Sequence, residues 1–384
     1  MKRLGIICLA VFLLIGTMPI AAGAVDLAIP AKAAVLMDAA TGTVLYEQDA
    51  HAALPPASVT KVMTMLLIME AIDQGRIGWE DTVTASESAA AKGGSQIYLK
   101  VGETMTVAEL LKSVAVSSAN DAACALAEHI AGSETAFVSM MNSRAQALGM
   151  NDTNFVNCTG LDDDETAKNH RTSAYDIALM SRQLLTKHPD IKKYTTIWMD
   201  TVRGGSFGLA NTNKLVRFYP GATGLKTGYT SQAGFCLSAS AQRDGMELIA
   251  VVLGCDTSAQ RFAACKQMLD HGFASYALIH PQTEKEITVP VKLGTEKQVR
   301  AVPSVDSALL IDKAQLNTVN IRTEVLDSVT APVSKGQRLG MMTITSGEQI
   351  LAEIPMVAAE PVEKLSWGAV FVKMLRCLCF GTAE

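Results

Sequence analysis

Three short stretches of this 384-residue chain carry side chains that could act together on a substrate. They are SVTK at 58–61, SAN at 118–120 and KTG at 226–228, and each occurs once. Ser58 and Lys61 are three residues apart, so they share one face of a helix if the segment is helical. A serine hydroxyl is a weak nucleophile until a base takes its proton, and a lysine can be that base when burial keeps it neutral. The first stretch therefore predicts a serine nucleophile paired with a lysine base.

The residues around the first stretch bear on a simpler hypothesis. Taken alone, Ser58 fits a helix cap and Lys61 fits a solvated side chain. The apolar run 62–69 favours the catalytic hypothesis, because such a run is typical of a buried helix that carries Lys61 inward. The N-terminus of that helix also offers backbone N–H groups to a developing oxyanion.

The other two stretches add groups that can relay protons and bind carboxylates. Ser118 and Asn120 interrupt an apolar helical segment, where a hydroxyl could relay a proton and an amide could donate and accept. The alternative is that one of them caps the second helix. Lys226 and Thr227 could grip a carboxylate from a strand, and Gly228 could let a substrate backbone approach closely. The alternative there is an ordinary exposed strand end.

Together the three stretches resemble the motifs of the penicillin-recognising serine enzymes. The similarity is closest to the low-molecular-weight penicillin-binding proteins that are D-alanyl-D-alanine carboxypeptidases. It extends to AVLMDAATG at 34–42 with LPPAS at 54–58, to GLD at 160–162 with HRTSAYD at 170–176, and to GLKTGYT at 224–230. The resemblance covers nearly the whole chain after the N-terminal segment, and it implies no cofactor.

This resemblance implies an acyl transfer with a role for each residue. Ser58 is expected to attack the carbonyl between two terminal D-alanines of a peptidoglycan stem peptide, with Lys61 as general base. Ser118 would pass a proton to the leaving amine, and Asn120 would position the substrate amide. Water would then hydrolyse the acyl-enzyme, whereas β-lactam antibiotics would leave Ser58 as a stable acyl-enzyme.

The resemblance also implies how the substrate is held. Lys226 and Thr227 are expected to bind the terminal carboxylate, and the Lys226 charge to lower the pKa of Lys61. The backbone N–H groups of Ser58 and Tyr229 would form the oxyanion hole. Tyr229 stands where many relatives have histidine, and since the position acts through its backbone, we expect activity to survive.

Two other functions stay open on the sequence. A class A β-lactamase uses a glutamate base, which the resemblance would place in an E-x-x-L-N loop, and ETAKN at 165–169 matches that loop only at its ends. The adjoining HRTSA at 170–174 fits the carboxypeptidase pattern instead. The second alternative is an inactive penicillin-binding scaffold that organises wall machinery, and the complete set of reactive residues argues against it.

Periodicity and resemblance together predict the elements that hold these residues. We expect an α/β (α+β) domain of the serine β-lactamase/transpeptidase-like type over 25–280, followed by a small all-β domain over 281–356. The first should contain strands 33–38 and 43–47, helices 58–71, 107–131 (broken near 117–120) and 176–185, strands 235–242 and 247–253, and a closing helix 258–278. The second should contain strands 286–289, 298–302, 308–311, 319–326, 338–344 and 349–354.

The N-terminus predicts export from the cytoplasm. Lys2 and Arg3 precede an uncharged run that closes in AGA at 22–24, which is the pattern of a signal peptide over 1–24. The alternative is an uncleaved membrane anchor, but the apolar core of the run is short for a spanning helix. We therefore expect the protein at the extracytoplasmic face of the bacterial cell membrane.

The C-terminal segment 357–384 predicts a linker and then an amphipathic helix fit to lie on a membrane surface. Pro355 and Pro361 mark the expected linker. Apolar residues from Trp367 to Leu378 recur at helical spacing, with basic residues on the polar flank. The alternative is a helix docked on its own domain.

The composition excludes other classes of partner. A formal charge of −5 argues against nucleic acid, and a chain with 49% hydrophobic and 18% charged residues is not disordered. The mean hydropathy of +0.21 is explained in part by the two apolar ends. Eight cysteines and six histidines show no metal-ligand spacing, so we expect no metal and regard most cysteines as buried small hydrophobes outside any required disulfide framework.

Overall fold

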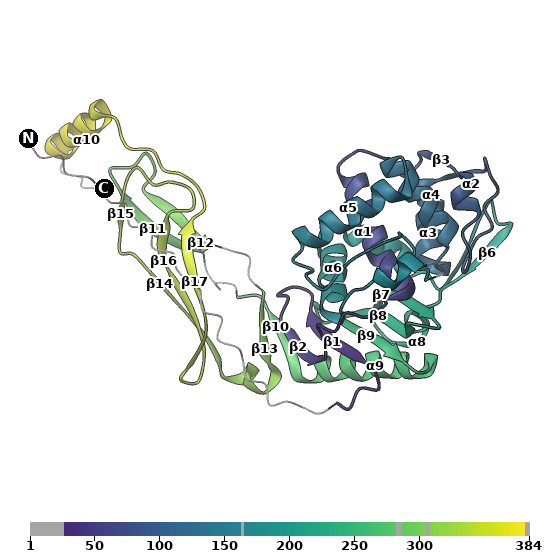
Figure 1. Cartoon of the computed structure of the whole chain (residues 1–384). Coiled ribbons are helices and arrows are strands. Elements are labelled where there is room, and N and C mark those ends of the chain that lie inside the picture. Colours follow the sequence, from purple (N-terminus) through teal and green to yellow (C-terminus); the bar gives the residue numbers. More distant parts are fainter. Residues whose placement is uncertain (1–26, 163–164, 282–285, 305–307, 381–384) are drawn as a thin grey trace, which may run out of the picture.

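The computed structural model describes residues 27–162, 165–281, 286–304 and 308–380. A mixed α/β domain is followed by a narrower β-rich domain, and a helix ends the described part of the chain (Figure 1). This arrangement confirms the expected fold class. The predicted signal peptide lies outside the described residues.

A five-stranded antiparallel sheet forms the centre of the first domain, in the order β2–β1–β9–β8–β7. Its strands are β1 (Ala33–Asp38), β2 (Val44–Gln48), β7 (Ala222–Thr230), β8 (Gly234–Arg243) and β9 (Met246–Cys255). The central strand β9 is buried over its whole length, because helices cover both faces of the sheet. Burial on both faces explains its nearly continuous apolar run.

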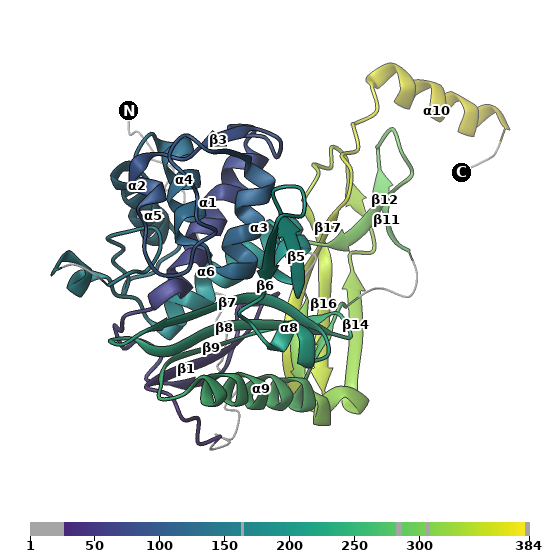
Figure 2. The same ribbon diagram turned by 90° about the vertical axis from the view of Figure 1, so that its right-hand side faces the viewer.

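Helices from different parts of the chain cover the two faces of this sheet (Figure 2). One face carries α9 (Ser258–Ser275). The helices of the other side are α1 (Lys61–Asp73), α3 (Val107–Ser117), α4 (Asn120–Ala131), α5 (Glu134–Ala147) and α6 (Ala174–Lys187). Residues 61–69 of α1 are all buried, which confirms the expected buried helix. A helix without a polar face must be enclosed by its neighbours, so α1 lies inside the helical cluster.

Short elements connect these helices and strands. They are η1 (Ala57–Thr60), β3 (Thr82–Thr84), α2 (Glu87–Ala90), β4 (Thr104–Thr106), η2 (Glu165–Asn169), η3 (Pro189–Ile191), α7 (Lys192–Thr195), β5 (Met199–Val202), β6 (Phe207–Ala210) and α8 (Leu215–Phe218). β3 pairs with β4, and β5 pairs with β6. The 3₁₀-helix η1 runs directly into α1 and carries Ser58 to the helix N-terminus.

The closing helix is shorter than the sequence predicted. α9 ends at Ser275, and β10 (Tyr276–Ile279) pairs antiparallel with β13 (Leu309–Asp312). The prediction of helix as far as Leu278 was wrong, because a short apolar run suits a strand as well as a helix. Leu310 of β13 is buried in the same cluster as residues of α9, so this strand pair joins the two domains.

The second domain is built on a six-stranded sheet in the order β14–β16–β17–β12–β11–β15. Its elements are β11 (Ile287–Lys292), β12 (Gln298–Pro303), η4 (Lys313–Thr318), β14 (Val319–Val325), β15 (Val329–Thr330), β16 (Arg338–Ser346) and β17 (Gln349–Ala358). Buried residues of alternating register form its aliphatic core. The all-β character of this domain is confirmed.

The chain leaves this domain later than the sequence predicted. β17 extends to Ala358, so Pro355 lies within a strand rather than in a linker. Val362 is buried in the domain core, and the N–H of Leu365 donates to the backbone carbonyl of Leu293. The expectation of a linker from Pro355 was wrong because a strand tolerates a proline wherever the ladder does not need the missing N–H.

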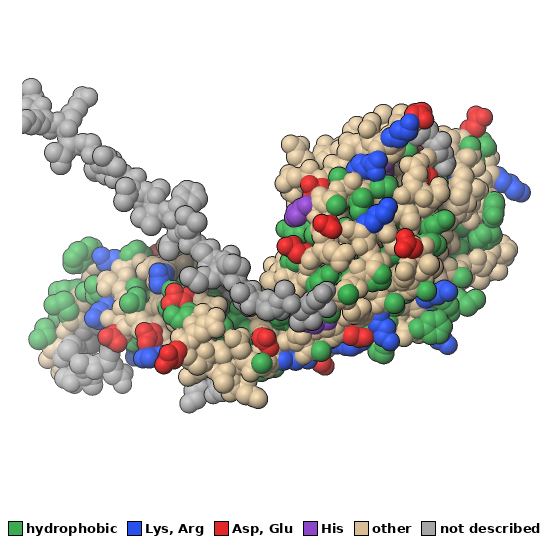
Figure 3. Space-filling model, turned by 60° about the horizontal axis from the view of Figure 1, so that its bottom comes forward, with side chains coloured by type: hydrophobic (Ala, Val, Ile, Leu, Met, Phe, Trp, Pro, Cys, Tyr) green, Lys and Arg blue, Asp and Glu red, His purple; other side chains and the backbone are tan. Residues whose placement is uncertain are grey.

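The helix α10 (Trp367–Phe380) lies at the end of the second domain that is farthest from the first (Figure 1). Trp367 is 89% exposed and Leu378 is 81% exposed. Figure 3 shows hydrophobic side chains gathered at this end of the molecule. In the described ranges, no helix combines the length and apolar character needed to cross a membrane.

Candidate active site

Ser58 and Lys61 meet where η1 joins α1. The Nζ atom of Lys61 donates to Ser58 Oγ at 2.8 Å and to the backbone carbonyl of Thr159 at 2.8 Å. The turn before them is strained, since Ala57 has a φ of +50°, which costs a non-glycine residue roughly 1–2 kcal/mol. The structure therefore brings the predicted nucleophile and the predicted base into direct contact.

Burial changes the acid–base behaviour of Lys61. The side chain has no exposed surface, and its desolvation lowers the pKa to about 7, although the nearby Cys158 and Asp121 act in the opposite direction. A large share of the amine is therefore neutral at physiological pH, as a general base requires. The alternative of a solvated lysine is wrong.

The Thr159 carbonyl lies directly before the GLD segment at 160–162, in a loop that contains none of the three reactive motifs. Asn157 Oδ1 accepts from the backbone N–H groups of Thr159 and Gly160. Gly160 has a φ of +81°, and a Cβ on it would lie 1.8 Å from the carbonyl oxygen of Ala57. Only glycine allows this loop to pack against η1 and place its carbonyl on Lys61. A backbone acceptor has no residue type of its own, so sequence reasoning could not identify Thr159.

Ser118 and Asn120 lie at the break between α3 and α4. Ser118 ends α3 in the left-handed conformation, and Ala119 is the N-cap of α4 without any side-chain hydrogen bond. The alternative that Ser118 or Asn120 caps α4 is therefore wrong. Asn120 Nδ2 donates to the carbonyl of Gly93 at 2.7 Å, whereas its Oδ1 is buried and has no hydrogen-bond partner in the described structure. The amide thus has a free acceptor.

The third motif lies on β7, the edge strand of the central sheet. Lys226 is buried, and its Nζ lies 3.0 Å from the carbonyl of Thr227. A Cβ on Gly228 would lie 2.6 Å from the carbonyl oxygen of Pro56 and 3.1 Å from the backbone nitrogen of Ser58. The small size of Gly228 thus admits the protein's own η1 segment beside the strand, and the approach of a substrate backbone stays a prediction.

The charge of Lys61 acts on Lys226, the second buried lysine of the site. The pKa of Lys226 is lowered well below its usual value, first by burial, then by the Lys61 charge and then by the Arg261 charge. We expected burial and the Lys226 charge to lower the Lys61 pKa together. Burial lowers it, whereas the Lys226 charge is not among the causes. Two facing ammonium groups in a desolvated site repel each other, so an anion is needed to hold both protonated.

Arg261 supports the third motif from behind the sheet. Its guanidinium, on α9, donates to the carbonyl of Gly228 at 2.8 Å and lies over the rings of Phe235 and Phe262. Arg261 was not predicted from the sequence, because it is 33 residues from Gly228 and lies in none of the three motifs. Tyr229, by contrast, is 58% exposed and packs on Phe235, so its ring is available at the surface.

His170 fixes the start of α1. Its Nδ1 accepts from the backbone N–H of Val156 at 3.1 Å, so Nε2 carries the proton and donates to Thr60 Oγ1 at 2.7 Å. Burial, followed by the Lys61 charge, lowers the pKa of His170 to about 4. A neutral histidine therefore links the 170–176 segment to η1 next to Ser58.

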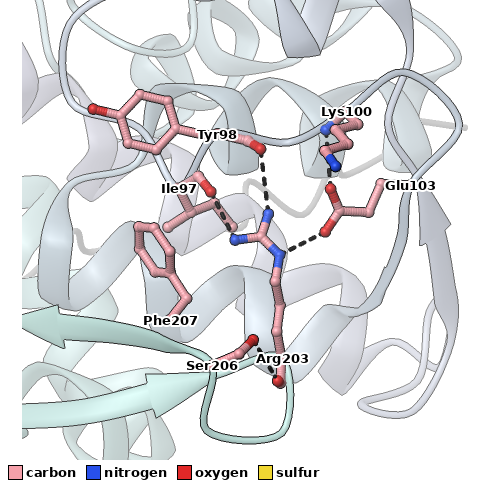
Figure 4. A pocket seen from close by; sticks show the side chains of 7 residues that line it. All are labelled: Ile97, Tyr98, Lys100, Glu103, Arg203, Ser206 and Phe207. Carbon is pink, nitrogen blue, oxygen red and sulfur yellow. Dashed lines mark hydrogen bonds and ion pairs between the residues drawn. The ribbon is translucent and has the colours of Figure 1, made fainter.

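A pocket lies along the loop 95–103, whose Ser95 carbonyl accepts from the backbone N–H of Asn120 (Figure 4). The carboxylate of Asp121 accepts from the backbone N–H groups of Ile97 and Leu99. Arg203, from the turn between β5 and β6, then pairs with Glu103 and donates to the carbonyls of the same loop. This arginine ties the β5–β6 hairpin to the loop beside the SAN motif.

Three features of this site define the class of penicillin-recognising serine hydrolases. They are a serine in contact with a buried lysine, a helix break that carries a hydroxyl and an open amide acceptor, and an edge strand that carries a lysine and a threonine. Two family models match the chain. One, described as D-alanyl-D-alanine carboxypeptidase, matches residues 20–257, and one described as the C-terminal domain of penicillin-binding protein 5 matches residues 276–364.

Named relatives are similar over most of the chain. The D-alanyl-D-alanine carboxypeptidase DacF of Bacillus subtilis is 45% identical over 346 residues, which is 88% of this chain and 87% of DacF. The D-alanyl-D-alanine carboxypeptidase DacA of Escherichia coli is 32% identical over 361 residues, which is 90% of this chain and 86% of DacA.

Solved structures show the same likeness. Penicillin-binding protein 5 from Haemophilus influenzae has a TM-score of 0.75 and 33% identity, over 88% of this chain and 98% of its own. Penicillin-binding protein D2 from Listeria monocytogenes, in its ampicillin-bound form, has a TM-score of 0.59 and 33% identity, over 65% of this chain and 100% of its own. The chain belongs to the D-alanyl-D-alanine carboxypeptidase family, whose members are serine hydrolases.

Proposed function

We propose that this enzyme removes the terminal D-alanine from peptidoglycan stem pentapeptides through an acyl-enzyme on Ser58. The observation that carries the proposal is the 2.8 Å contact between Lys61 Nζ and Ser58 Oγ, made by a fully buried lysine whose pKa is about 7. A base of that pKa, held against a hydroxyl, is what an activated serine requires.

In the first half of the reaction, neutral Lys61 takes the proton of Ser58, and Oγ attacks the carbonyl carbon between the two D-alanines. The backbone N–H groups of Ser58 and Tyr229 hold the oxyanion, and the close approach of Gly228 to the Ser58 nitrogen supports this assignment. As the C–N bond breaks, the Ser118 hydroxyl donates its proton to the leaving amine and takes up the proton that Lys61 had accepted. D-alanine departs, and Lys61 is neutral again.

In the second half, a water molecule attacks the ester carbonyl and gives its proton to Lys61. The bond to Ser58 Oγ breaks, Lys61 returns the proton to Oγ, and the shortened peptide leaves with a new terminal carboxylate. Lys61 thus serves as proton acceptor in both halves.

The remaining polar groups of the site bind the substrate. The free Oδ1 of Asn120 accepts from a substrate amide N–H, and this use explains a buried acceptor without a partner. Lys226 Nζ and Thr227 Oγ1 bind the terminal carboxylate. That anion raises the pKa of Lys226, so the binding cation is restored when substrate arrives.

β-Lactams acylate the same serine. Their amine stays tethered to the acyl group after ring opening, so it blocks the water that would release Ser58. The Listeria protein solved in ampicillin-bound and cefotaxime-bound forms supports this proposal.

A β-lactamase base at Glu165 is disfavoured, since this side chain is 86% exposed and forms an ion pair with Lys168. An inactive scaffold is disfavoured by the intact Ser58–Lys61 contact.

A substitution of the nucleophile tests the function. Purified protein is incubated with a diacetylated Lys-D-Ala-D-Ala tripeptide and, separately, with a fluorescent penicillin. The unmodified enzyme should release D-alanine and lose the label slowly. Ser58→Ala should abolish both reactions, whereas Ser139→Ala, on the exposed side of α5, should leave them unchanged. Release of D-alanine by Ser58→Ala would refute the mechanism, rapid label turnover would indicate a β-lactamase, and no release by the unmodified enzyme would indicate a scaffold.

We also infer that the enzyme works at the extracytoplasmic membrane surface and that α10 holds it there. Phe371, Met374 and Leu378 are exposed at helical spacing, which supports insertion of an apolar face into the bilayer interface. A chain that ends at Ser366 keeps the Leu365 contact with the second domain. It should no longer float with anionic lipid vesicles, whereas the full chain should. Flotation of both chains would contradict this role of α10.

A further inference from the structure

Two cysteines that are distant in the sequence lie together beneath the active site. Cys124 is on α4 and Cys158 is in the loop before Thr159, and both side chains are fully buried and unlinked. Their Sγ atoms and a carboxylate oxygen of Glu134 all lie within 4.8 Å of one another. The tertiary structure therefore creates a thiol pair that spacing in the sequence did not suggest.

The charged groups next to the two cysteines, Glu134 and Lys92, neutralise each other without any charge on the sulfurs. Glu134 accepts from Cys158 Sγ and from the Cys158 backbone N–H, both at 3.2 Å. The other carboxylate oxygen pairs with Lys92 Nζ at 2.6 Å and lies 3.8 Å from Cys124 Sγ. Because the carboxylate and the ammonium compensate each other, the sulfur atoms are best left uncharged, as thiols or as a disulfide.

Both cysteines belong to segments that position the active site. The carbonyl of Cys158 accepts from Thr64 Oγ1 at 2.6 Å, and the next carbonyl along the chain, that of Thr159, accepts from Lys61. Cys124 follows Asn120 by four residues on α4. A covalent link between the two sulfurs would join the loop that holds the general base to the helix that begins with the substrate-binding amide.

We propose that a disulfide, formed as the exported chain folds, joins Cys124 and Cys158 in the finished enzyme. Each thiol loses its hydrogen, and the two electrons and two protons pass to an external disulfide, which is cleaved to two thiols. The sulfurs must approach to about 2.05 Å. Because the two sulfurs already lie within 4.8 Å of each other, the approach that the bond requires is less than about 3 Å.

The surroundings also indicate when the link forms. The hydrogen bond with Cys124, then burial, and then the Glu134 charge raise the pKa of the Cys158 thiol well above its usual value. A disulfide forms through a thiolate that an oxidant can reach. In the folded enzyme these thiols are protonated and buried, so both conditions fail. The link therefore forms while the chain folds, and the finished enzyme keeps it as a structural cross-link.

A thiophilic metal ion would use the same three ligand types, but the site is less suited to it. A divalent ion bound to Glu134 would face the ammonium of Lys92, which already lies 2.6 Å from that carboxylate. The disulfide adds no charge. The disulfide therefore fits this cluster better than a metal ion does, and zinc binding is the alternative outcome of the test below.

The test is a refolding experiment on the full chain in a non-ionic detergent. Reduced, unfolded protein is refolded in a mixture of reduced and oxidised glutathione, then alkylated in denaturant and mapped by mass spectrometry. A parallel sample is refolded with reductant and zinc sulfate. Cys124→Ser and Cys158→Ser are compared with Cys265→Ser, which removes another fully buried thiol, on α9. Fluorescent penicillin labelling shows which samples have refolded.

We expect peptides that contain Cys124 and Cys158 to be joined, with a mass 2 Da below their sum, in unmodified protein and in Cys265→Ser. Either partner variant should lack the link. Closing a loop of 34 positions (158 minus 124) should raise the thermal midpoint by roughly 5–10 °C over the reduced protein. Recovery of both cysteines as alkylated thiols in penicillin-labelled protein would overturn the proposal. Stoichiometric zinc that protects both thiols from alkylation would overturn it in favour of a metal site.

Discussion

Lys61 Nζ lies 2.8 Å from Ser58 Oγ, and the lysine that makes this contact has no exposed surface. Burial lowers the pKa of Lys61 to about 7, so the amine gains its catalytic, neutral form as the pH rises through 7. We therefore predict that the second-order rate of Ser58 acylation by a fluorescent penicillin increases with pH, with an apparent pKa near 7. A rate that is flat between pH 5.5 and 8.5 would contradict this origin of the base.

The variant Lys61→Arg tests whether the neutral form of this side chain is required, because a guanidinium stays protonated at every accessible pH. It should lose about 10²–10⁴-fold in acylation rate, which is the usual contribution of a general base. Lys187→Arg, on the exposed end of α6, serves as the control and should be unaffected. The measurement is a stopped-flow or gel-based acylation time course.

The same buried lysine should reduce stability. Between pH 7 and 10.5 the unfolded chain binds a proton at Lys61 that the folded chain does not, so stability rises with pH in that window. Lys61→Met should be inactive but more stable at pH 7 by roughly 2–4 kcal/mol. Urea unfolding at pH 7 and pH 9 should show that the difference in unfolding free energy between the variant and the unmodified enzyme is smaller at pH 9. A variant less stable than the unmodified enzyme at pH 7 would argue against this account.

Lys226 should matter only to substrates with a free terminal carboxylate. Lys226→Met should reduce kcat/KM for the diacetylated tripeptide about 10²-fold, through loss of a charge-assisted contact of about 2–3 kcal/mol. The C-terminally amidated peptide should be poor for both enzymes, so the unmodified enzyme discriminates between the two peptides and the variant does not. Equal discrimination by both enzymes would place the carboxylate elsewhere.

Gly228 should be intolerant of a single methyl group. In Gly228→Ala the new Cβ would meet the carbonyl oxygen of Pro56 at 2.6 Å, so β7 must move away from η1. Acylation should fall at least 10-fold, because a small misplacement of reacting groups carries a large kinetic cost. Gly208→Ala is the matched control, since that strand glycine has open space around its Cβ position. Similar acylation rates in both variants would show that the close approach is unimportant.

His170 should make stability fall in mild acid. Burial keeps its pKa at about 4, whereas an unfolded histidine titrates near 6.5, so the unfolded chain binds the extra proton between these values. Up to about 3 kcal/mol should be lost as the pH falls from 6.5 to 4. Comparing urea unfolding of the enzyme and of His170→Asn at pH 7 and 4.5 isolates this contribution. Parallel losses in both proteins would assign the acid sensitivity to other groups.

Local patterns in the chain were enough to predict several parts of the structure. The Ser58–Lys61 pairing follows from spacing within one helical turn, and the burial of Lys61 follows from the apolar run behind it. The break between α3 and α4 and the β8–β9 hairpin were also predicted, since both depend on neighbouring residues. The strand β10 and the late end of β17 were not, because their partners lie in distant segments.

The sequence by itself determined which reactive side chains are present and which of them share a local element. The tertiary structure decided how the three motifs converge, that the Thr159 carbonyl holds Lys61, and that Gly228 serves the approach of β7 to η1. It also brought Cys124 and Cys158 together. The physical reason is that spacing along a chain encodes contacts within a few residues, whereas close packing between distant segments depends on the shapes of both partners.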